Sequence, residues 1–568
     1  MKVDVLVAEI GSTTTVVNAF TDLNTDSPVF WGQGQAPTSV LDGDVRVGLQ
    51  GAIDDLCKKK GIDSLEYDDM LATSSAAGGL KMTVHGLVYD MTAKAAKEAA
   101  LGAGGIIHYI TAGKLRRTDI AKIKEINPNL ILIAGGVDYG ERDTAIDNAE
   151  MIRSMGLKTP VIYAGNIENQ EEMKLIFDEE SGMQLYNVEN VYPKIDDLNV
   201  EPCRKVIQDA FEQHITHAPG MEHVRDMVSG PIVPTPGAVM ECTKLLYDCI
   251  GDLIVLDVGG ATTDLHSVAV ESDKVARIMV SPEPKAKRTV EGDLGVYVNR
   301  YKVIESIGEE KLREECEQMG IDLDKTLESY VAIPKTEDEF KLVERLTLEA
   351  VTKATERHAG QIRYIYGPSG RSTVAEGKDL TQVKYIVGTG GALTRLPHRV
   401  EIMQQIARHN ETGMLLFPTE HAKILVDNDY IMASLGVLSK KYRDAAIKLL
   451  EQSLDFKFPD KKDDVEIPVY MKEIEEEYQE SKKREEEYRK HIEEAEEMGY
   501  DMSAFKEEEP IGGANKRGPE GTAFDPEKEA IAAGEGLSGK WETKGQYMGD
   551  CTHDCKHCTR RNCPNRVE

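Results

Sequence analysis

Strand-like and helix-like patterns of apolar residues alternate along most of the chain. Short apolar runs that end in small or polar residues, at 4–10, 129–140 and 159–166, predict buried strands. Apolar residues spaced three or four apart predict helices at 41–61 and 141–156. Because such strands and helices follow one another in turn, the sequence predicts an α/β fold built of layers.

The chain contains two halves that begin alike. The first half opens with a strand that runs into "AEIGSTTT" at residues 8–15, and the second opens with a strand that runs into "LDVGGATTD" at residues 256–264. This likeness predicts an ancient duplication, with one lobe at 1–250 and a second lobe at 251–454.

Four further segments stand apart from the two lobes. A stretch at about 92–165, with a small-residue helix followed by two strands that each end in glycine, predicts a unit inserted into the first lobe. Residues 455–504 carry dense Glu, Lys and Arg around a short heptad seam, which indicates a charged helix that either lies solvated against its own protein or pairs with a partner. The Gly-, Pro- and Glu-rich residues 505–540 predict a flexible linker to a cysteine-rich tail at 541–568.

The charge of the chain argues against two classes of partner. Its 568 residues include 99 acidic and 68 basic side chains, and the formal net charge of -31 repels nucleic acid and anionic membrane surfaces. No apolar run reaches the roughly 18 residues of a membrane helix, and the N-terminal run is too short for a signal peptide. We therefore expect a cytoplasmic protein that binds neither nucleic acid nor membrane.

The two matching turns place glycine and hydroxyl side chains directly after a strand. Backbone N–H groups and hydroxyls in such a turn hold an anion, and glycine lets the main chain approach it closely. The second turn adds Asp257 and Asp264, and carboxylates beside phosphates usually hold a hydrated Mg²⁺. A third glycine cluster, "VGTGGALT" at residues 387–394, offers bare backbone to a flat ring, and neither a Walker A loop nor a dinucleotide-fold glycine motif describes these segments.

In their order along residues 1–442, the three segments resemble the phosphate-1, phosphate-2 and adenosine motifs of the actin, sugar kinase and heat-shock-protein-70 ATPase superfamily. The resemblance implies two actin-like (ribonuclease H-like) lobes with ATP and Mg²⁺ between them. It also implies catalytic roles for Glu9 and Asp257, and Mg²⁺ binding through water by Asp257 and Asp264. The implied nucleotide contacts are Gly11, Ser12, Thr13, Thr14, Gly259, Gly260, Ala261, Thr262, Gly388, Gly390 and Gly391.

Two departures from the superfamily pattern bear on ATP turnover. Glu9 stands where Asp is usual, which moves the carboxylate by about one methylene, roughly 1.5 Å. Val233, in a segment similar to the superfamily's connecting helix, stands where heat-shock ATPases have a water-activating Glu, so a general-base contribution of about 10²–10⁴-fold would be missing. We therefore expect slow hydrolysis, or ATP binding without turnover.

The chain also resembles one family within this superfamily. Segments such as "TAKAAKEAALGAGGII", "LILIAGGVDYGERDTAIDNAE", "VPTPGAV" and "DNDYIMASLGVLS" are similar to the MutL (GlmL) accessory proteins of glutamate mutase, which are unrelated to mismatch-repair MutL, and to their relatives beside ornithine aminomutase. This resemblance implies an ATP-dependent chaperone that reactivates an adenosylcobalamin-dependent mutase by expelling damaged cobalamin. Residues from 455 onward lie outside the shared core, which favours a subfamily that serves a different mutase.

The C-terminal tail contains a compact set of cysteines. The spacing C-x3-C-x2-C-x4-C lets four thiolates converge on one centre and suits zinc or an iron–sulfur cluster equally, with a neighbouring histidine able to replace one ligand. Part of the spacing also matches the radical S-adenosylmethionine signature, but no barrel follows it. The residues concerned are Cys551, Cys555, Cys558 and Cys563, with His553 and His557 beside them.

Two other functions fit parts of the sequence. An ATP-driven electron donor, like the activators of 2-hydroxyacyl-CoA dehydratases, requires iron in the tail, although those proteins carry their cluster cysteines in the ATPase core. A small-molecule kinase requires an Asp aimed at a substrate hydroxyl, and the sequence offers no distinctive candidate. Two isolated residues have simpler interpretations: His266 as a surface or strand histidine, and Arg371, in "GPSGRST", as part of a polar loop.

Overall fold

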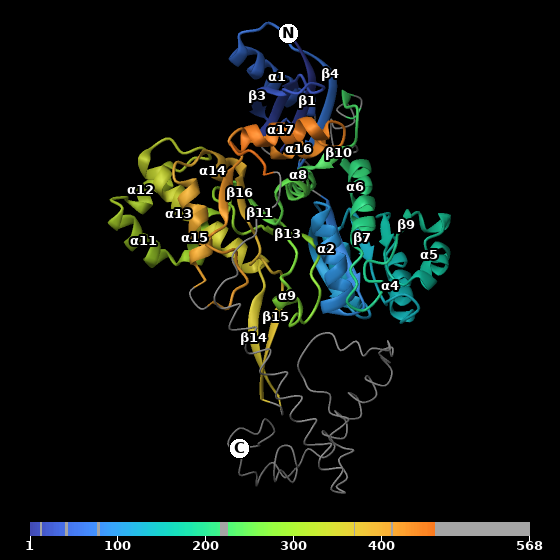
Figure 1. The fold of residues 1–568 in the computed structure, drawn as a ribbon. Helices are drawn as coiled ribbons and strands as arrows, with labels where there is room; N and C mark the ends of the chain where they lie inside the picture. The colour runs from blue at the N-terminus through green and yellow to red at the C-terminus, as the bar shows by residue number, and fades with distance from the viewer. Residues whose placement is uncertain are drawn as a thin grey trace. The chain divides into compact units, whose positions relative to one another are not determined.

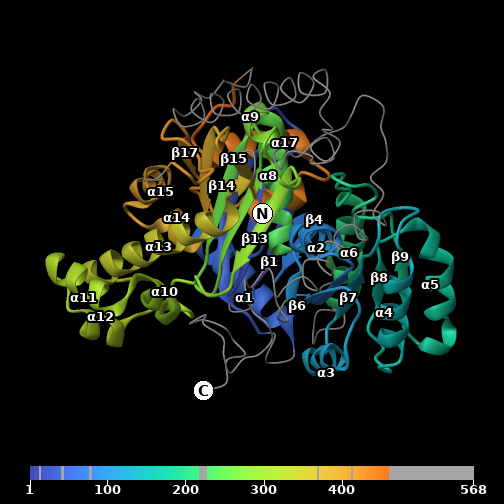
Figure 2. The same cartoon turned by 90° about the horizontal axis from the view of Figure 1, so that it is seen from below.

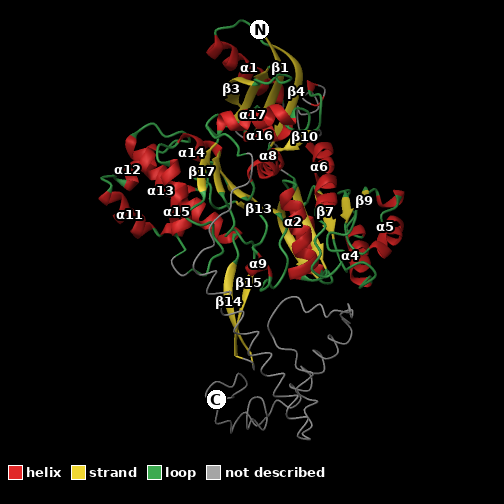
Figure 3. Cartoon of the chain, viewed as in Figure 1, coloured by secondary structure: helices red, strands yellow, loops and turns green. Residues whose placement is uncertain are grey.

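The computed structural model describes residues 1–11, 14–39, 44–75, 80–215, 225, 227–367, 370–410 and 413–459. Within these ranges the chain forms three five-stranded sheets and one two-stranded hairpin (Figures 1 and 3). We call the part that carries β1–β4 and β10 lobe I, the part that carries β11–β17 lobe II, and the part that carries β5–β9 the inserted unit. The predicted charged helix, linker and cysteine-rich tail lie outside the described residues, apart from 455–459.

Lobes I and II are built on the same sheet. The strand order is β10-β4-β1-β2-β3 in lobe I and β13-β12-β11-β16-β17 in lobe II. In each lobe the first three strands along the chain pair antiparallel, and the fourth and fifth add in parallel on the other side of the first. This repeat confirms the predicted α/β fold class of duplicated actin-like lobes. The strands are β1 (Lys2–Ile10), β2 (Thr14–Thr21), β3 (Val29–Pro37), β4 (Glu66–Ser74), β10 (Ile232–Pro234), β11 (Leu253–Val258), β12 (Thr263–Val268), β13 (Ala286–Glu291), β16 (Tyr385–Thr389) and β17 (Lys423–Val426).

Strand β1 is buried along most of its length because helices cover both faces of its sheet. Leu6, Ala8 and Ile10 share a core with α1 (Val45–Lys60), whereas the alternate residues Val5 and Val7 point into the core on the opposite face. Helix α1 begins at the cap residue Asp44, which accepts a hydrogen bond from the N–H of Arg46, and it ends at Gly61 in the left-handed region (φ 67°).

The core on that opposite face joins the two lobes. Helices α8 (Thr235–Ile250) and α16 (Met432–Leu438) pack between the sheet of lobe I and the sheet of lobe II, and α17 (Arg443–Ser453) adds to the same core (Figure 1). A Cβ at Gly436 would lie 1.9 Å from the carbonyl oxygen of Ala238, so only glycine permits this close crossing of α16 over α8.

The other face of the lobe II sheet is covered by helices from the second half of the chain. The longest of them, α13 (Glu337–His358), starts with a capping box in which Thr336 and Glu339 bond each other's backbone N–H groups. The remaining elements of lobe II are α9 (Asp273–Ala276), α10 (Arg300–Ile307), α11 (Glu309–Gln318), α12 (Leu323–Ser329), β14 (Gln361–Gly367), β15 (Gly370–Glu376), α14 (Gly390–Arg395) and α15 (Arg399–Arg408).

The inserted unit is a parallel, doubly wound sheet in the order β6-β5-β7-β8-β9. Helices α2 and α6 pack on the face that carries Leu130 and Leu132, and α3, α4 and α5 pack on the face that carries Ile131 and Ile133 (Figure 2). The sheet extends beyond the predicted 92–165 on both sides. Its elements are β5 (Lys81–Gly86), η3 (Tyr89–Ala93), α2 (Lys94–Gly102), β6 (Ile106–Ala112), α3 (Arg117–Ile126), β7 (Leu130–Ile133), α4 (Asp143–Arg153), β8 (Val161–Tyr163), η4 (Ile167–Asn169), α5 (Gln170–Ile176), η5 (Glu179–Ser181), β9 (Leu185–Asn187) and α6 (Glu201–Ile215).

In the part of the chain that the structure describes, no helix combines the length and the apolar character that a membrane crossing requires.

Candidate functional site

The two glycine turns found in the sequence are equivalent in structure. Each closes the hairpin between the first two strands of its lobe, with a hydrogen bond from Gly11 N to Thr14 O (3.0 Å) in lobe I and from Gly259 N to Thr262 O (2.9 Å) in lobe II. Ser12 and Thr13, the central residues of the first turn, lie outside the described residues. The structural equivalence therefore concerns the ends of the two turns, Gly11 with Gly259 and Thr14 with Thr262.

In the second turn, the carbonyl oxygens of Gly260 and Ala261 accept hydrogen bonds from the segment 297–299. The carbonyl of Gly260 accepts hydrogen bonds from Tyr297 N (2.9 Å) and Val298 N (2.7 Å), and that of Ala261 accepts one from the Asn299 side chain (2.7 Å). Gly260 and Ala261 are exposed, and their N–H groups have no protein partner within the described ranges. Exposed N–H groups in a glycine turn are the donors that an anionic phosphate requires.

Glu9 lies two residues before the first turn and is buried. Its Oε1 accepts hydrogen bonds from the hydroxyl of Ser434 (2.6 Å), on α16, and from the side-chain amide of Asn18 (3.2 Å), on β2. Burial raises the pKa of Glu9 to about 7, and the charge of Asp427 adds to the rise while the bond from Ser434 opposes it. At neutral pH this carboxyl is therefore divided between its protonated and ionised forms.

Asp257 occupies the same position in lobe II, two residues before the second turn. Burial raises its pKa to about 7, and the charges of Asp264, its cross-strand neighbour, and of Glu9 add to the rise. The charge of Glu9 thus raises the proton affinity of Asp257, which holds the equivalent position in the other lobe. A cation bound near them would relieve this repulsion and favour their ionised forms.

Asp264 is paired with an arginine that the sequence analysis did not find. Its Oδ1 accepts two hydrogen bonds from the buried guanidinium of Arg288, from Nε (2.9 Å) and Nη2 (2.5 Å), and its Oδ2 accepts one from the Thr262 hydroxyl (3.2 Å). The third nitrogen of Arg288 donates to the carbonyl oxygen of Leu101 (2.9 Å), at the end of α2. The predicted binding of Mg²⁺ by Asp264 stays a prediction, and it has to compete with this ion pair.

Two further groups near the carboxyls also went unnoticed in the sequence. Asp427 is fully buried, accepts hydrogen bonds from Ile431 N, Met432 N and the hydroxyls of Thr389 and Ser453, and so fixes the start of α16. Tyr430 has a left-handed backbone (φ 55°), and burial together with the charges of Asp257 and Glu9 raises its pKa. Both lie in the segment 427–439 that carries the family resemblance, which is the only signal that points to them.

The glycines of the third motif have different surroundings. Gly388 lies inside β16 and faces the side chain of Met403, whereas a Cβ on Gly391 would meet nothing within 4 Å. Gly390 has a φ of 81°, and a Cβ there would lie 2.4 Å from Asp257 Oδ1. Gly391 is thus the residue of this motif that leaves space for a ring, and contact of any of the three with a nucleotide stays a prediction.

The crowding at Gly390 yields a matched pair of variants. We expect Gly390→Ala to lower the free energy of unfolding by about 2–4 kcal/mol, because the methyl group strains a left-handed backbone and collides with Asp257. Gly391→Ala, with open space around it, is expected to change stability by no more than about 0.5 kcal/mol. Urea unfolding of both variants tests this, and equal stabilities would contradict the described approach of Gly390 to Asp257.

Among the described residues, the side chains of this site offer oxygen atoms as ligands for a cation. Carboxylates and hydroxyls suit Mg²⁺, which keeps several of its waters. Within the described ranges no group of three or more His, Cys, Asp or Glu side chains is arranged to hold a metal directly. The four predicted tail ligands, Cys551, Cys555, Cys558 and Cys563, lie outside the described residues, so zinc or an iron–sulfur cluster stays a prediction.

The structure shows the surroundings of three further residues that the sequence analysis names. Val233 is buried in β10 and supplies no proton acceptor. His266 is buried in β12, burial lowers its pKa, and neither ring nitrogen has a hydrogen-bond partner within the described part of the chain. Arg371, on β15, lies 4.4 Å from the ring centre of Tyr364. His266 is thus a strand histidine, one of the two interpretations that the sequence allowed.

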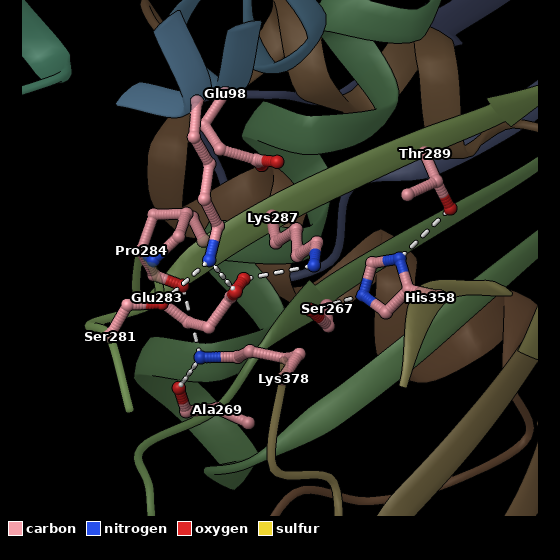
Figure 4. A network of polar contacts seen from close by, with 12 residues as sticks. Glu98, Ser267, Ala269, Ser281, Glu283, Pro284, Lys287, Thr289, His358 and Lys378 are labelled. Atoms are coloured by element: carbon pink, nitrogen blue, oxygen red, sulfur yellow. Dashed lines mark hydrogen bonds and ion pairs between the residues drawn. The ribbon is translucent and has the colours of Figure 1, made fainter. Parts of the chain in front are cut away.

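Buried charged groups join α2 of the inserted unit to β13 of lobe II (Figure 4). Glu283 accepts hydrogen bonds from Lys94 (2.5 Å) and from Lys287 (2.9 Å), and burial raises the pKa of the neighbouring Glu98. Arg204, from α6, donates to the carbonyl oxygens of Glu98 (3.2 Å) and Ala286 (2.7 Å). Hydrogen bonds and ion pairs therefore connect β13, the strand that carries Arg288, to α2.

The two carboxyls with a pKa of about 7 predict a pH dependence of stability. Their folded-state pKa values lie above the ordinary values. The stability that the two groups contribute to the folded state is therefore fully present below about pH 4 and is lost as the pH rises through 7. Between pH 5.5 and 8, the free energy of unfolding should fall by about 2 kcal/mol for each such group. Thermal unfolding at both pH values tests this, with Asp257→Asn as the control in which the loss should shrink. An equal loss in the variant would contradict the assignment.

A model of the family described as "MutL protein" matches residues 5–454. Protein MutL of Clostridium tetanomorphum is 36% identical over 428 residues, which cover 73% of this chain and 92% of that protein.

Solved structures with a similar fold have much lower identities. A nucleotide-free acetone carboxylase is 11% identical, covers 77% of this chain and 70% of its own, and has a TM-score of 0.37. A nucleotide-free diol dehydratase-reactivating factor is 9% identical, covers 77% of this chain and 99% of its own, and has a TM-score of 0.29.

Proposed function

Because this chain belongs to the MutL family, we propose that it is an ATP-binding accessory protein of an adenosylcobalamin-dependent amino-acid mutase. The mutase would be one similar to glutamate mutase or an ornithine aminomutase, reactivated by ATP-driven exchange of damaged cobalamin. The observation that carries the proposal is the extent of the family match, which takes in both glycine turns and the whole inserted unit.

We assign ATP and Mg²⁺ to the two turns. The exposed N–H groups of Gly260 and Ala261 and the hydroxyl of Thr14 would hold the phosphates, and the open space at Gly391 would border the adenosine. The hydroxyl of Thr262 would join them by turning away from Asp264, to which it donates here. Mg²⁺, with its waters ordered by Asp257, would neutralise the phosphate charge. Glu9 and Asp257 fit such a cation, since each gains a full negative charge more readily when a positive charge is near.

ATP hydrolysis by this site would be slow. Val233 provides no proton acceptor, and we assign the role of proton acceptor to Glu9, a buried carboxyl whose pKa is about 7. Its Oε1 is already bonded to Ser434 and Asn18. A slowly hydrolysing site suits a protein that uses nucleotide to hold one of two conformations.

Arg288 would link the nucleotide site to the inserted unit. One guanidinium bonds both Asp264, next to the second turn, and Leu101, at the end of α2. Any displacement of the Asp264 carboxylate would therefore change a contact of α2. A nucleotide that favours one arrangement of this ion pair would therefore also favour one of two conformations of the inserted unit.

Recovery of mutase activity tests the proposal. An adenosylcobalamin-dependent aminomutase inactivated by air or by suicide turnover is incubated with the purified full chain, fresh adenosylcobalamin and ATP, and mutase activity is followed. We expect recovery only when ATP and the chain are both present, with ADP and chain-free mixtures as controls. ATP binding without recovery of glutamate mutase or ornithine aminomutase would contradict the proposal. A reducible iron–sulfur band would then favour an electron donor.

A further inference from the structure

The carboxyl ends of three neighbouring strands in the inserted unit carry exposed apolar side chains. The loops that follow β7 (residues 134–142), β8 (164–169) and β9 (188–199) form what we call the three-loop platform. Each loop exposes one large apolar residue: Tyr139 (77% exposed), Ile167 (48%) and Ile195 (40%). In parallel α/β sheets this edge is where ligands and partners usually bind.

Side-chain hydrogen bonds tie the three loops together. Asp138 donates its N–H to the carbonyl oxygen of Pro193 (3.0 Å), and its Oδ1 accepts from Ile167 N (3.0 Å) and from the buried Asn190 amide (3.0 Å). The buried Asn166 accepts from Tyr139 N (3.0 Å) and donates to the carbonyl oxygens of the same loop. Residues 138–139, 166–167 and 193 are therefore held side by side.

The platform holds two residues in a strained backbone conformation. Tyr139 has a φ of 65° and Asp196 a φ of 60°, in the left-handed region that non-glycine residues seldom adopt. Such strain persists where the surrounding structure over-determines the loop, and it concentrates at functional sites. Here Asn166 bonds the N–H of Tyr139, and the hydroxyl of Tyr192 accepts from the N–H of Asp196 (2.9 Å).

The rim of the platform is acidic. The three loops carry five exposed acidic side chains against two exposed basic ones, and one of the basic residues, Arg142, lies 3.8 Å from Glu168 in an ion pair. The acidic residues are Glu141, Glu168, Glu189, Asp196 and Asp197, and the second basic residue is Lys194. A complementary partner would therefore present Lys or Arg around its contact.

We propose that the three-loop platform is the docking surface for the partner mutase, with Tyr139 and Ile167 inserted into an apolar depression that basic residues surround. This inference rests on the proposed function for the identity of the partner. Rigid, exposed aromatic residues carry much of the energy of protein interfaces, because little conformational entropy is lost when they bind. The acidic rim would speed and orient the encounter.

Variants at Tyr139 separate docking from folding. Tyr139→Gly removes the aromatic ring and leaves a residue that adopts a φ of 65° without strain, so the thermal midpoint should stay equal or rise. Ile167→Ala removes the neighbouring apolar contact. Leu175→Ala, on α5, is the control because Leu175 is 69% exposed but lies off the platform.

Binding of the full-length chain to the inactivated aminomutase is measured by biolayer interferometry with ATP present. We expect Tyr139→Gly to weaken binding by about 10- to 100-fold and Ile167→Ala by about 5-fold, while Leu175→Ala stays within about 2-fold of wild type. Raising NaCl from about 50 to 300 mM should slow association of the wild type.

The outcomes distinguish this inference from the function on which it rests. Wild-type chain that binds and reactivates the mutase, together with Tyr139→Gly that does so equally well, would overturn the platform and leave the proposed function standing. Wild-type chain that neither binds nor reactivates the mutase in either nucleotide state would overturn both. Reduced binding by Tyr139→Gly at an unchanged thermal midpoint would support the platform.

Discussion

Asp257→Asn is expected to weaken Mg²⁺-dependent ATP binding by about 10- to 100-fold, the usual cost of removing a group that orients a metal's ligands. The physical reason is that Asn carries no charge to order the waters of the cation. At the same time the nucleotide-free protein should become more stable at pH 8, because the variant no longer ionises a half-buried carboxyl beside Asp264 and Glu9. Isothermal titration with Mg·ATP and thermal unfolding without nucleotide measure the two effects.

The opposite signs of these two effects make the prediction specific. Asp63→Asn, which makes the same charge change at an exposed position in the turn between α1 and β4, should alter neither ATP affinity nor stability noticeably. That turn precedes β4 and so lies at the opposite edge of the lobe I sheet from Glu9. Unchanged ATP affinity in Asp257→Asn would contradict the assignment of the nucleotide to the second turn.

Arg288→Met is expected to lower the free energy of unfolding by about 3–5 kcal/mol, because it leaves the carboxylate of Asp264 buried without its partner. Adding Asp264→Asn to this variant should recover part of the loss, since no buried charge is then unpaired. Urea unfolding measures all three proteins. Hydrogen exchange in α2 should also increase in Arg288→Met, because Leu101 loses its hydrogen bond to the guanidinium.

A surface arginine provides the comparison for this large effect. Arg313 also bonds carboxylates, Asp324 at 2.8 Å and Glu309 at 3.3 Å, but it is exposed. Arg313→Met should therefore cost no more than about 1 kcal/mol. If both variants lost the same stability, the burial of the Arg288 pair would not be the source of its effect.

Much of the architecture follows from local patterns along the chain. The apolar run of β1 ends in glycine and hydroxyl residues, the pattern recurs at β11, and the structure closes both hairpins with the same hydrogen bond. The small-residue helix and the glycine-ended strands predict an inserted unit at about 92–165, and the sheet in the structure also includes β5 and β9, which lie outside that range. Strand β5 precedes the small-residue helix and β9 has only three residues, so neither belongs to the local pattern that marked the unit.

Local sequence patterns do not predict which residues the site residues contact. Glu9 bonds Ser434, which is 425 residues away, and Asp264 bonds Arg288 across a strand pair whose register no local sequence specifies. The same holds for the platform, where Asp138 meets Asn190 and Pro193 only because β7 and β9 lie in one sheet.

By itself, the sequence determined the alternation of strands and helices, the duplicated glycine turns and the family, since each is written in residues close together or in their order. The tertiary structure alone decided which carboxyls are removed from solvent and which of them pairs with Arg288. It also decided that Tyr139 is exposed on a loop with a strained backbone, held by hydrogen bonds. Burial and pairing depend on contacts between residues far apart in the chain, and these exist only once the sheets have formed.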